Sequence, residues 1–325
     1  MDSVCNGRAK VMSGNSHRAL AQEIANLMGT TLLDAEIGKF SDGEISLKIT
    51  ETVRGCDIFV VQPTSTPVND NLMELLIMID ALKRASAGRI VAVLPYYGYA
   101  RQDRKSRARD PISAKLVADI ITTAGADRIV TMDLHCPQIQ GFFNIPVDHL
   151  VGLPKFIEYY KKKFPGMEDV AVVSPDLGST GKARSLADIL HTTVAIVDKK
   201  RDKPNESKVM DIIGDVLGKN VIMIDDMIDT AGSIANAACA VMEAGAKSVH
   251  VCCTHGVFSG QAYTRLQASP IEEVVCLDTI DHTNCQHIDK IKYISVADIF
   301  ANALSRIHDG RPVSEIFEEH DIRYN

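Results

Sequence analysis

A run of acidic and small polar residues at positions 224–233, IDDMIDTAGS, carries the clearest chemistry in this sequence. It follows an apolar run typical of a buried strand and precedes an alanine-rich run that predicts a helix. A strand, a turn and a helix start present backbone N–H groups and the positive end of the helix dipole, which favour phosphate. Thr230, Gly232 and Ser233 suit such a turn, because small residues admit a phosphate and hydroxyls donate hydrogen bonds to it.

Two adjacent acids, Asp225 and Asp226, would repel a phosphate bound at the same point. They make sense if their carboxylates face sugar hydroxyls, or a metal ion, while the turn beyond them holds the phosphate. This order of residues predicts a sugar-phosphate site. The alternative is an acidic strand end followed by an ordinary capped helix.

A second group of candidates lies just past other apolar runs. His135 follows IVTMDL, and Asp176 follows VVSP. Both positions would reach the ligand crevice of a parallel sheet, which lies at the carboxyl ends of its strands. They are plausible joint ligands for a nucleotide-bound Mg²⁺, which takes one or two protein ligands and fills its shell with water and phosphate. His135 could instead act as an acid or base, or simply cap a helix.

Two basic segments suit polyphosphate. Residues 101–109 hold five cations and residues 198–203 hold four. Each follows an apolar run, so both predict loops at the edge of the crevice, where cations can neutralise charge that develops in phosphoryl transfer. The alternative for either segment is a solvated charged face. The turn at residues 40–44, FSDGE, combines an aromatic residue with two acids, and the simpler interpretation is a β-hairpin turn.

Composition excludes several classes of protein. The chain has 325 residues, 46% of them hydrophobic and 24% charged, which predicts a globular protein of two domains. No apolar run is long enough to span a membrane, and no signal core opens the chain. A net charge of −7 without a long basic run makes nucleic acid a poor partner. The eight cysteines lack zinc-ligand spacing and predict free thiols in a reducing cytoplasm, although Cys285 and His287 could suggest a metal pair.

The sequence contains an internal duplication with an offset of about 161 residues, and its two copies begin at Val11 and Val172. Each copy alternates β-rich runs with amphipathic helices, which predicts an α/β fold of two duplicated domains, each a mostly parallel sheet flanked by helices. We place the domains at residues 1–152 and 153–325, with the last dozen or so residues packing on the N-terminal domain. Where the second copy has Asp225 and Asp226, the first has Gln62 and Pro63, so we expect the sugar-phosphate site in the second copy alone.

Taken together, these motifs resemble one family over essentially the whole chain. The blocks that carry the resemblance are NDNLMELL at 69–76, YARQD at 99–103, DLH at 133–135, QIQGFF at 138–143, the acidic run at 225–233 and HGVFSG at 255–260. The chain is similar to ribose-phosphate pyrophosphokinases, also called phosphoribosyl-pyrophosphate (PRPP) synthetases. The 225–233 block alone would indicate only the wider phosphoribosyltransferase fold.

The resemblance implies Mg²⁺-dependent transfer of the β,γ-pyrophosphoryl group of ATP to the anomeric hydroxyl of ribose 5-phosphate, releasing AMP. It also implies residue roles. On the sugar side, ribose hydroxyls are bound by Asp225 and Asp226, and the 5-phosphate by Asp229, Thr230, Ala231, Gly232 and Ser233. On the ATP side, ATP is contacted by Arg101, Gln102 and Asp103, and adenine is recognised across a subunit boundary by Phe40, Asp42 and Glu44; a catalytic loop carries Lys199 and Arg201, and the Mg²⁺ lies near Asp176 and His135, which is also a catalytic candidate.

The resemblance further implies a homo-oligomer, a hexamer built from dimers, in the cytoplasm. Where relatives regulated by phosphate and ADP place serines, this chain has Ala108 and Pro312, so we expect weakened regulation. Ser179 stands where a second glycine is common. Two alternatives are a non-catalytic relative that regulates such enzymes, and a phosphoribosyltransferase or PRPP-binding regulator. The residues of the catalytic loop argue against the first, and the basic 101–109 loop against the second.

Overall fold

The computed structural model describes residues 7–199 and 210–318, which divide into two compact units. The first unit contains the described residues up to Val151, with Thr279–Asp281 and Ser295–Ile316. The second is formed mainly by Gly152–Asp278 and His282–Ile294. The domain limits at residues 152 and 153 stay a prediction, and residues 319–325, expected to pack on the first domain, lie outside the described part.

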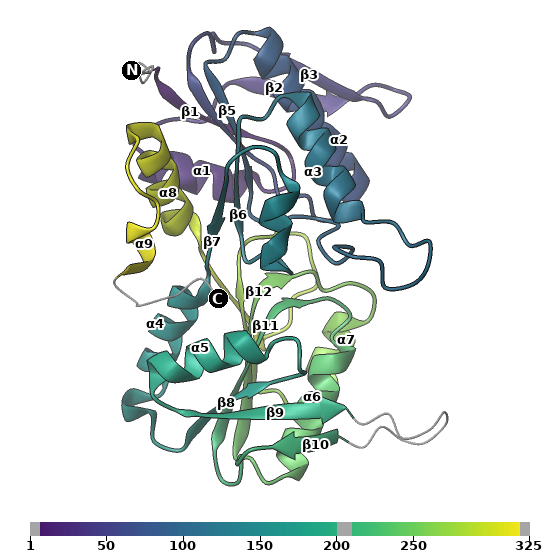
Figure 1. The fold of residues 1–325 in the computed structure, drawn as a ribbon, viewed down its shortest axis with the longest axis vertical. Coiled ribbons are helices and arrows are strands. Elements are labelled where there is room, and N and C mark those ends of the chain that lie inside the picture. The colour runs from purple at the N-terminus through teal and green to yellow at the C-terminus, as the bar shows by residue number, and fades with distance from the viewer. Residues whose placement is uncertain (1–6, 200–209, 319–325) are drawn as a thin grey trace. The chain divides into compact units, whose positions relative to one another are not determined.

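The first unit is built on a five-stranded parallel sheet of order β1-β4-β5-β6-β7, with a separate antiparallel hairpin, β2-β3. Its strands are β1 (Ala9–Ser13), β2 (Ala35–Lys39), β3 (Ile45–Ile49), β4 (Asp57–Val61), β5 (Arg89–Leu94), β6 (Arg128–Met132) and β7 (Val147–Leu150). Its helices are α1 (Arg18–Leu27), α2 (Val68–Arg84), α3 (Ser113–Ala124), the 3₁₀ turn η1 (Pro137–Phe142) and α8 (Ala297–Asp309). Helices α1 and α8 cover one face of the sheet, and α2 and α3 cover the other (Figure 1).

The second unit is built on a seven-stranded sheet of order β10-β9-β8-β11-β12-β13-β14, in which only β10 is antiparallel to its neighbour. Its strands are β8 (Val170–Ser174), β9 (Thr193–Lys199), β10 (Met210–Ile213), β11 (Asn220–Ile228), β12 (Ser248–Gly256), β13 (Glu273–Leu277) and β14 (Ile291–Ile294). Its helices are α4 (Leu153–Lys163), the 3₁₀ turn η2 (Pro165–Met167), α5 (Thr180–Leu190), α6 (Gly232–Glu243) and α7 (Ala262–Ala268). The short helix α9 (Glu315–Glu318) ends the described chain.

The two sheets repeat the same strand order. Strands β1-β4-β5-β6-β7 correspond to β8-β11-β12-β13-β14, and Ala9 opposite Asp57 matches Val170 opposite Asn220. Helices lie on both faces, so the strands are buried on both sides and read as continuous apolar runs such as DIFVV and SVHVCCTHG. The predicted duplication into two mostly parallel sheets flanked by helices is confirmed.

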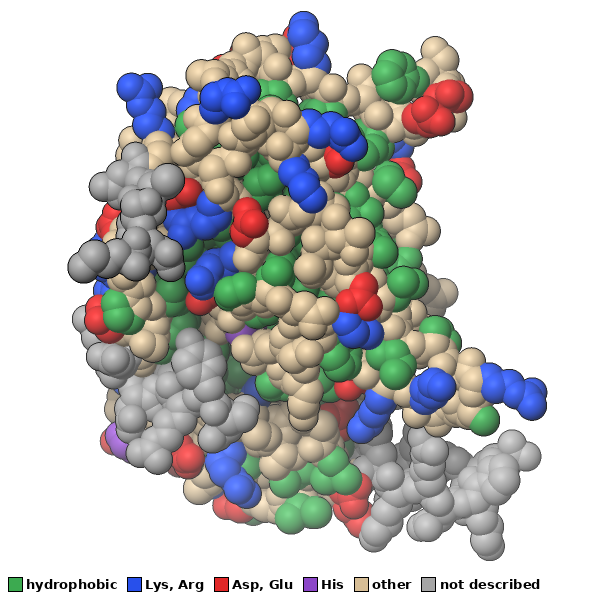
Figure 2. Space-filling model, turned by 45° about the horizontal axis from the view of Figure 1, so that its top comes forward, with side chains coloured by type: hydrophobic (Ala, Val, Ile, Leu, Met, Phe, Trp, Pro, Cys, Tyr) green, Lys and Arg blue, Asp and Glu red, His purple; other side chains and the backbone are tan. Residues whose placement is uncertain are grey.

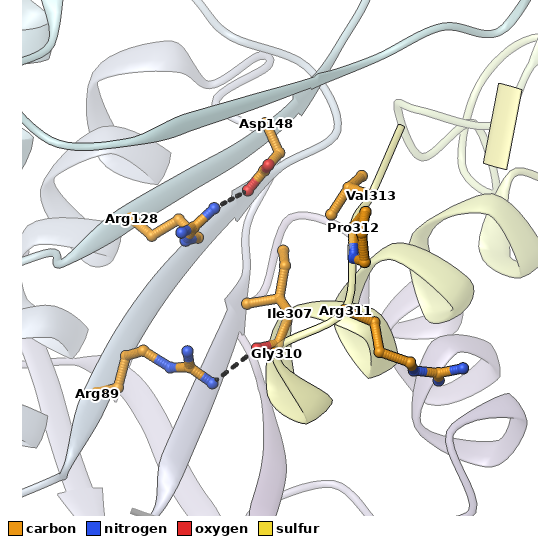
Figure 3. A pocket seen from close by; sticks show the side chains of 8 residues that line it. All are labelled: Arg89, Arg128, Asp148, Ile307, Gly310, Arg311, Pro312 and Val313. Atoms are coloured by element: carbon orange, nitrogen blue, oxygen red, sulfur yellow. Dashed lines mark hydrogen bonds and ion pairs between the residues drawn. The ribbon is translucent and has the colours of Figure 1, made fainter. Parts of the chain in front are cut away.

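Helix α8 is held on the first unit by charged groups at the amino-terminal edge of the sheet. The Arg89 guanidinium donates to Asp57 at 2.5 Å and to the Ile307 carbonyl at 3.2 Å, and Asp57 Oδ2 lies 2.8 Å from His308 Nδ1. Next to them, a cavity of about 340 Å³ is lined by Arg128, whose guanidinium pairs with a carboxylate of β7 (Figure 3). This cavity lies at the amino-terminal edge of the first sheet, opposite to the carboxyl edge, where His135 follows β6.

An equivalent charged cluster fastens α4 to the sheet of the second unit. Glu273 is 4% exposed, and its carboxylate lies 2.8 Å from Lys163 Nζ and 3.0 Å from Lys292 Nζ. It also accepts from the Tyr159 hydroxyl at 2.9 Å and lies 3.3 Å from His250 Nδ1. Burial opposes ionisation, but these donors together outweigh it and hold the pKa of Glu273 below its usual value.

We expect Glu273→Gln to destabilise the protein by roughly 1.5–3 kcal/mol at pH 7, because it weakens several hydrogen bonds to one buried charge. A lowered carboxyl pKa contributes stability above the unfolded-state value of about 4.5, and this contribution is lost as pH falls through the folded-state pKa. The difference in free energy of unfolding between the parent and the variant should therefore decrease below pH 4.5. Urea unfolding at pH 7 and 3.5 measures it, with exposed Glu168→Gln as the control. A difference independent of pH would contradict this account.

Candidate functional site

The acid pair lies on a part of β11 that extends beyond its neighbour. Strand β8 pairs with β11 only as far as Met223, whereas β12 follows β11 to Ile228. Asp225 and Asp226 are therefore the first residues past the end of β8, at the carboxyl edge of the sheet where ligands bind in folds of this type. Asp226 is 6% exposed and Asp225 is half-buried.

The turn after β11 is built for a close approach of the backbone. Ala231 is the N-cap of α6 and adopts a left-handed conformation, with φ of 59°, which is uncommon for a residue other than glycine. Helix α6 begins at Gly232, so the N–H groups of its first turn have no partner within the helix. Residues 229–233 thus form the predicted turn between a strand and a helix N-terminus, and two of them carry hydroxyl side chains. Their binding of a phosphate stays a prediction.

Burial and mutual repulsion control the charge of the acid pair. Burial, and after it the neighbouring charge of Asp226, raises the pKa of Asp225 to about 7. The Ser179 hydroxyl, which donates to Asp225 Oδ1 at 2.7 Å, and the positive charge of Lys182 oppose this rise. The Asp226 N–H also donates to Asp225 Oδ1, at 2.9 Å. Lys182 Nζ lies 3.7 Å from Asp226 Oδ1. Ser179 and Lys182 come from the start of α5, and sequence reasoning did not connect them with the acids.

The segment after β12 supports the turn at residues 229–233 through hydrogen bonds. The N–H groups of Phe258 and Ser259 donate to the carbonyls of Ile228 and Asp229, each at 3.0 Å, and the Ser259 hydroxyl donates to the Asp229 carboxylate. Arg265 Nη1 donates to the Thr230 carbonyl at 2.8 Å. The sequence block 255–260 marked this segment, but Arg265, which adds a positive charge beside the turn, carried no local signal.

The corresponding position in the first unit is closed. Gln62, which follows β4 as Asp225 follows the apolar core of β11, is fully buried. Its amide donates to Glu74 at 2.9 Å and to the Asn71 carbonyl at 3.2 Å, and its carbonyl oxygen accepts from Ser16. A Cβ at Gly14 would lie 2.1 Å from that oxygen. The Gln62 side chain is thus held among protein groups, and the placement of the sugar-phosphate site in the second unit alone stays a prediction.

The two predicted metal ligands lie in different units. In the second, Asp176 follows β8, and its Oδ1 accepts from the N–H groups of Gly178 at 2.9 Å and Ser179 at 3.2 Å. In the first, exposed His135 follows β6 and a left-handed Asp133, with φ of 40°. Among the described residues, no three His, Cys, Asp or Glu side chains gather as a metal site would require. The shared Mg²⁺ site stays a prediction.

The remaining predicted residues of the first unit lie on exposed loops. Residues 101–103 follow β5, and the Gln102 carbonyl accepts from the Ala114 N–H of α3 at 3.2 Å. Residues 40–44 form the turn of the β2-β3 hairpin, where the Phe40 N–H donates to the Glu44 carbonyl at 2.8 Å and Phe40 is 59% exposed. Hydrophobic and acidic side chains lie together on the projection at the upper right of Figure 2, where this hairpin extends.

The predicted catalytic loop falls largely outside the described residues. Lys199 is the last residue of β9, and only its backbone is described. Arg201 lies in the segment 200–209, which is not described. Their roles stay predictions. Within residues 7–199 and 210–318, no helix combines the length and apolar character that a membrane-spanning segment needs.

Comparison with known proteins agrees with this geometry. Residues 9–125 match the model of the N-terminal domain of ribose phosphate pyrophosphokinase, and residues 199–318 match the phosphoribosyl synthetase-associated domain. A ribose-phosphate pyrophosphokinase of Clostridium tetani is 60% identical over 310 residues, which are 95% of this chain and 97% of that protein. The chain belongs to the ribose-phosphate pyrophosphokinase family. Its relative from Bacillus caldolyticus is 54% identical over 97% of this chain and all of that protein.

A solved structure of the family shares the fold. The phosphoribosylpyrophosphate synthetase of Mycobacterium smegmatis superposes with a TM-score of 0.89 at 43% identity, over 93% of this chain and 99% of that one. Family membership and the predicted fold class are thus both confirmed.

The raised pKa of Asp225 makes the stability of the ligand-free protein depend on pH. A raised carboxyl pKa contributes stability at low pH that is lost as pH rises through about 7. Asp225→Asn lacks this dependence. We compare the free energy of unfolding of the variant with that of the parent. The difference, variant minus parent, should be about 2 kcal/mol larger at pH 8.5 than at pH 5.5, since one pKa unit is worth about 1.4 kcal/mol. Urea unfolding at both pH values measures the difference, and an equal difference at both would refute the raised pKa.

Proposed function

We propose that this chain synthesises 5-phosphoribosyl 1-pyrophosphate by transferring the β,γ-pyrophosphoryl group of ATP to the anomeric hydroxyl of ribose 5-phosphate, with AMP as the other product. The observation that carries the proposal is the junction of β11 and α6. There, a pair of acids suited to sugar hydroxyls is followed at once by a helix start suited to a phosphate. The names of the relatives support the same reaction.

The chain's own residues would supply binding and orientation. Asp225 and Asp226 would accept hydrogen bonds from the ribose hydroxyls, while residues 229–233 would hold the 5-phosphate with N–H and hydroxyl donors. This grip would fix the sugar so that its anomeric oxygen can attack the β-phosphorus in line with the departing AMP. Pyrophosphoryl transfer depends on alignment and charge neutralisation, because no covalent intermediate on the protein is needed.

We assign ATP binding to loops of the first unit and to a metal ion. We assign ATP contacts to Arg101, Gln102 and Asp103, and recognition of the adenine base to residues 40–44 of a neighbouring subunit. Bound Mg²⁺ would neutralise the polyphosphate. The carboxylate of Asp176 fits Mg²⁺ well, whereas the imidazole of His135 is of a class that prefers softer metals, so we expect phosphate oxygens and water to complete the shell.

The assembly and its regulation are further parts of the proposal. Adenine recognition across a boundary requires a homo-oligomer, which we take to be a hexamer of dimers. Weakened control by phosphate and ADP fits Pro312, which lacks an N–H and lines the cavity beside Arg128 and Asp148, whose charges already neutralise each other at 2.5 Å.

Product analysis tests the function directly. The purified protein is incubated with Mg²⁺, ATP and ribose 5-phosphate, without added phosphate, and the nucleotides are separated by ion exchange. We expect AMP to appear in step with PRPP, and activity without phosphate would support weakened regulation. ADP in place of AMP would indicate an ordinary sugar kinase. No turnover even with phosphate restored would favour a non-catalytic regulatory relative.

Lys199 tests the catalytic loop. We expect Lys199→Ala to leave ATP binding nearly unchanged and to lower turnover by roughly a hundredfold or more, the cost of removing one electrostatic stabiliser of the transferring group. Lys162→Ala, on the exposed face of α4, serves as the control and should keep full turnover. Normal turnover in Lys199→Ala would remove this lysine from the mechanism.

A further inference from the structure

The first turn of α5 reaches both members of the acid pair. Ser179 is the N-cap of α5, is 7% exposed, and donates its hydroxyl to Asp225 Oδ1 at 2.7 Å. Lys182, three residues later, places its ammonium group 3.7 Å from Asp226 Oδ1. Residues three apart on a helix lie on the same face, so one turn of α5 presents a hydroxyl to one acid and a cation to the other.

These contacts restrain the carboxyl group of Asp225. Asp225 Oδ1 already receives the Ser179 hydroxyl and the Asp226 N–H at 2.9 Å. Two donors on one oxygen restrain the rotation of the carboxyl group, so we expect a sugar hydroxyl to bind at Oδ2. Hydrogen bonds to the charged form also favour ionisation against burial, and an ionised carboxylate accepts hydrogen bonds better than a neutral one.

Ser179 also links two loops of the site. Its backbone N–H donates to Asp176 Oδ1 at 3.2 Å while its side chain holds Asp225. The Ser174 hydroxyl donates to the Asp176 carbonyl at 2.6 Å, which closes the same loop on itself. A single residue thus sets the position of Asp176 relative to Asp225 within the second unit.

We propose that Ser179 and Lys182 are positioning residues for ribose recognition, which orient and charge the acid pair without touching the reacting atoms. The inference rests on the proposed function, because it assigns Asp225 and Asp226 to the sugar hydroxyls. It predicts a selective effect: losing either contact weakens binding of the sugar phosphate and leaves ATP binding unchanged. A residue needed only for folding would lower both affinities, or the amount of folded protein, together.

The first test compares Ser179→Ala, Ser179→Thr and Ser185→Ala. Ser185 is a matched control, because it lies on the same helix and its hydroxyl donates to the Gly181 carbonyl of that helix. We expect Ser179→Ala to raise the KM for ribose 5-phosphate about tenfold, as for a lost hydrogen bond to a charged group, with the KM for ATP within about twofold. Ser179→Thr keeps the hydroxyl and should restore most of the affinity, and Ser185→Ala should behave as the parent.

The second test replaces Lys182 by Met and by Arg, with Lys162→Met as the exposed control on α4. Lys182→Met should raise the KM for ribose 5-phosphate several-fold, and Lys182→Arg should recover it. Calorimetric titration of ribose 5-phosphate without ATP should show the same order of affinities, and thermal unfolding confirms that each variant is folded.

The outcomes separate the inference from the proposed function. A parent protein that forms no AMP with PRPP refutes the proposed function and with it the ribose assignment. A parent that forms both, with folded Ser179→Ala and Lys182→Met variants of unchanged KM for ribose 5-phosphate, refutes the positioning role alone. Equal increases in both KM values would also refute it, since they indicate a general structural effect.

Discussion

Two adjacent carboxylates on a buried strand impose the main constraint on the second unit. Asp225 and Asp226 lie at the end of β11, where burial makes ionisation costly and each charge raises the cost for the other. Specific donors in the surrounding structure offset part of this cost, and the pKa of Asp225 remains raised. Asp225 accepts hydrogen bonds from the Ser179 hydroxyl and the Asp226 N–H, and the Lys182 ammonium group lies close to Asp226. The start of α5 supplies both Ser179 and Lys182.

The turn beyond the acids needs a different kind of support. Ala231 is held in a left-handed conformation that costs free energy in a residue with a Cβ, and such conformations persist where neighbouring structure over-determines them. Here the support comes from the segment after β12, through Ser259 and Arg265. A phosphate site made of backbone N–H groups depends on such bracing, because its donors are useful only while the turn keeps its shape.

The two copies of the duplicated fold differ in the side chains at the end of one corresponding strand. Five strands of the second sheet repeat the order of the first sheet, and both sheets place a polar residue just beyond the apolar core of the corresponding strand. In the second copy, that residue is Asp225, and it faces the candidate site. In the first, the buried Gln62 side chain forms hydrogen bonds with Ser16, Asn71 and Glu74. Parallel strand order brings this position to the carboxyl edge in both copies, and the side chain there differs between them.

The sequence by itself determined the fold class, the duplication and the order of acids, turn and helix. These follow from local patterns: apolar runs of strand length, amphipathic helices, and small polar residues at a helix start. Only the tertiary structure decided which side chains from distant segments contact the acids and the turn. Ser179, Lys182 and Arg265 are ordinary polar residues in the sequence, and nothing in their neighbours connects them with positions 225–233. Their contacts arise because parallel strands bring the carboxyl ends of β8, β11 and β12 to one edge, a juxtaposition of residues more than thirty positions apart that no local pattern encodes.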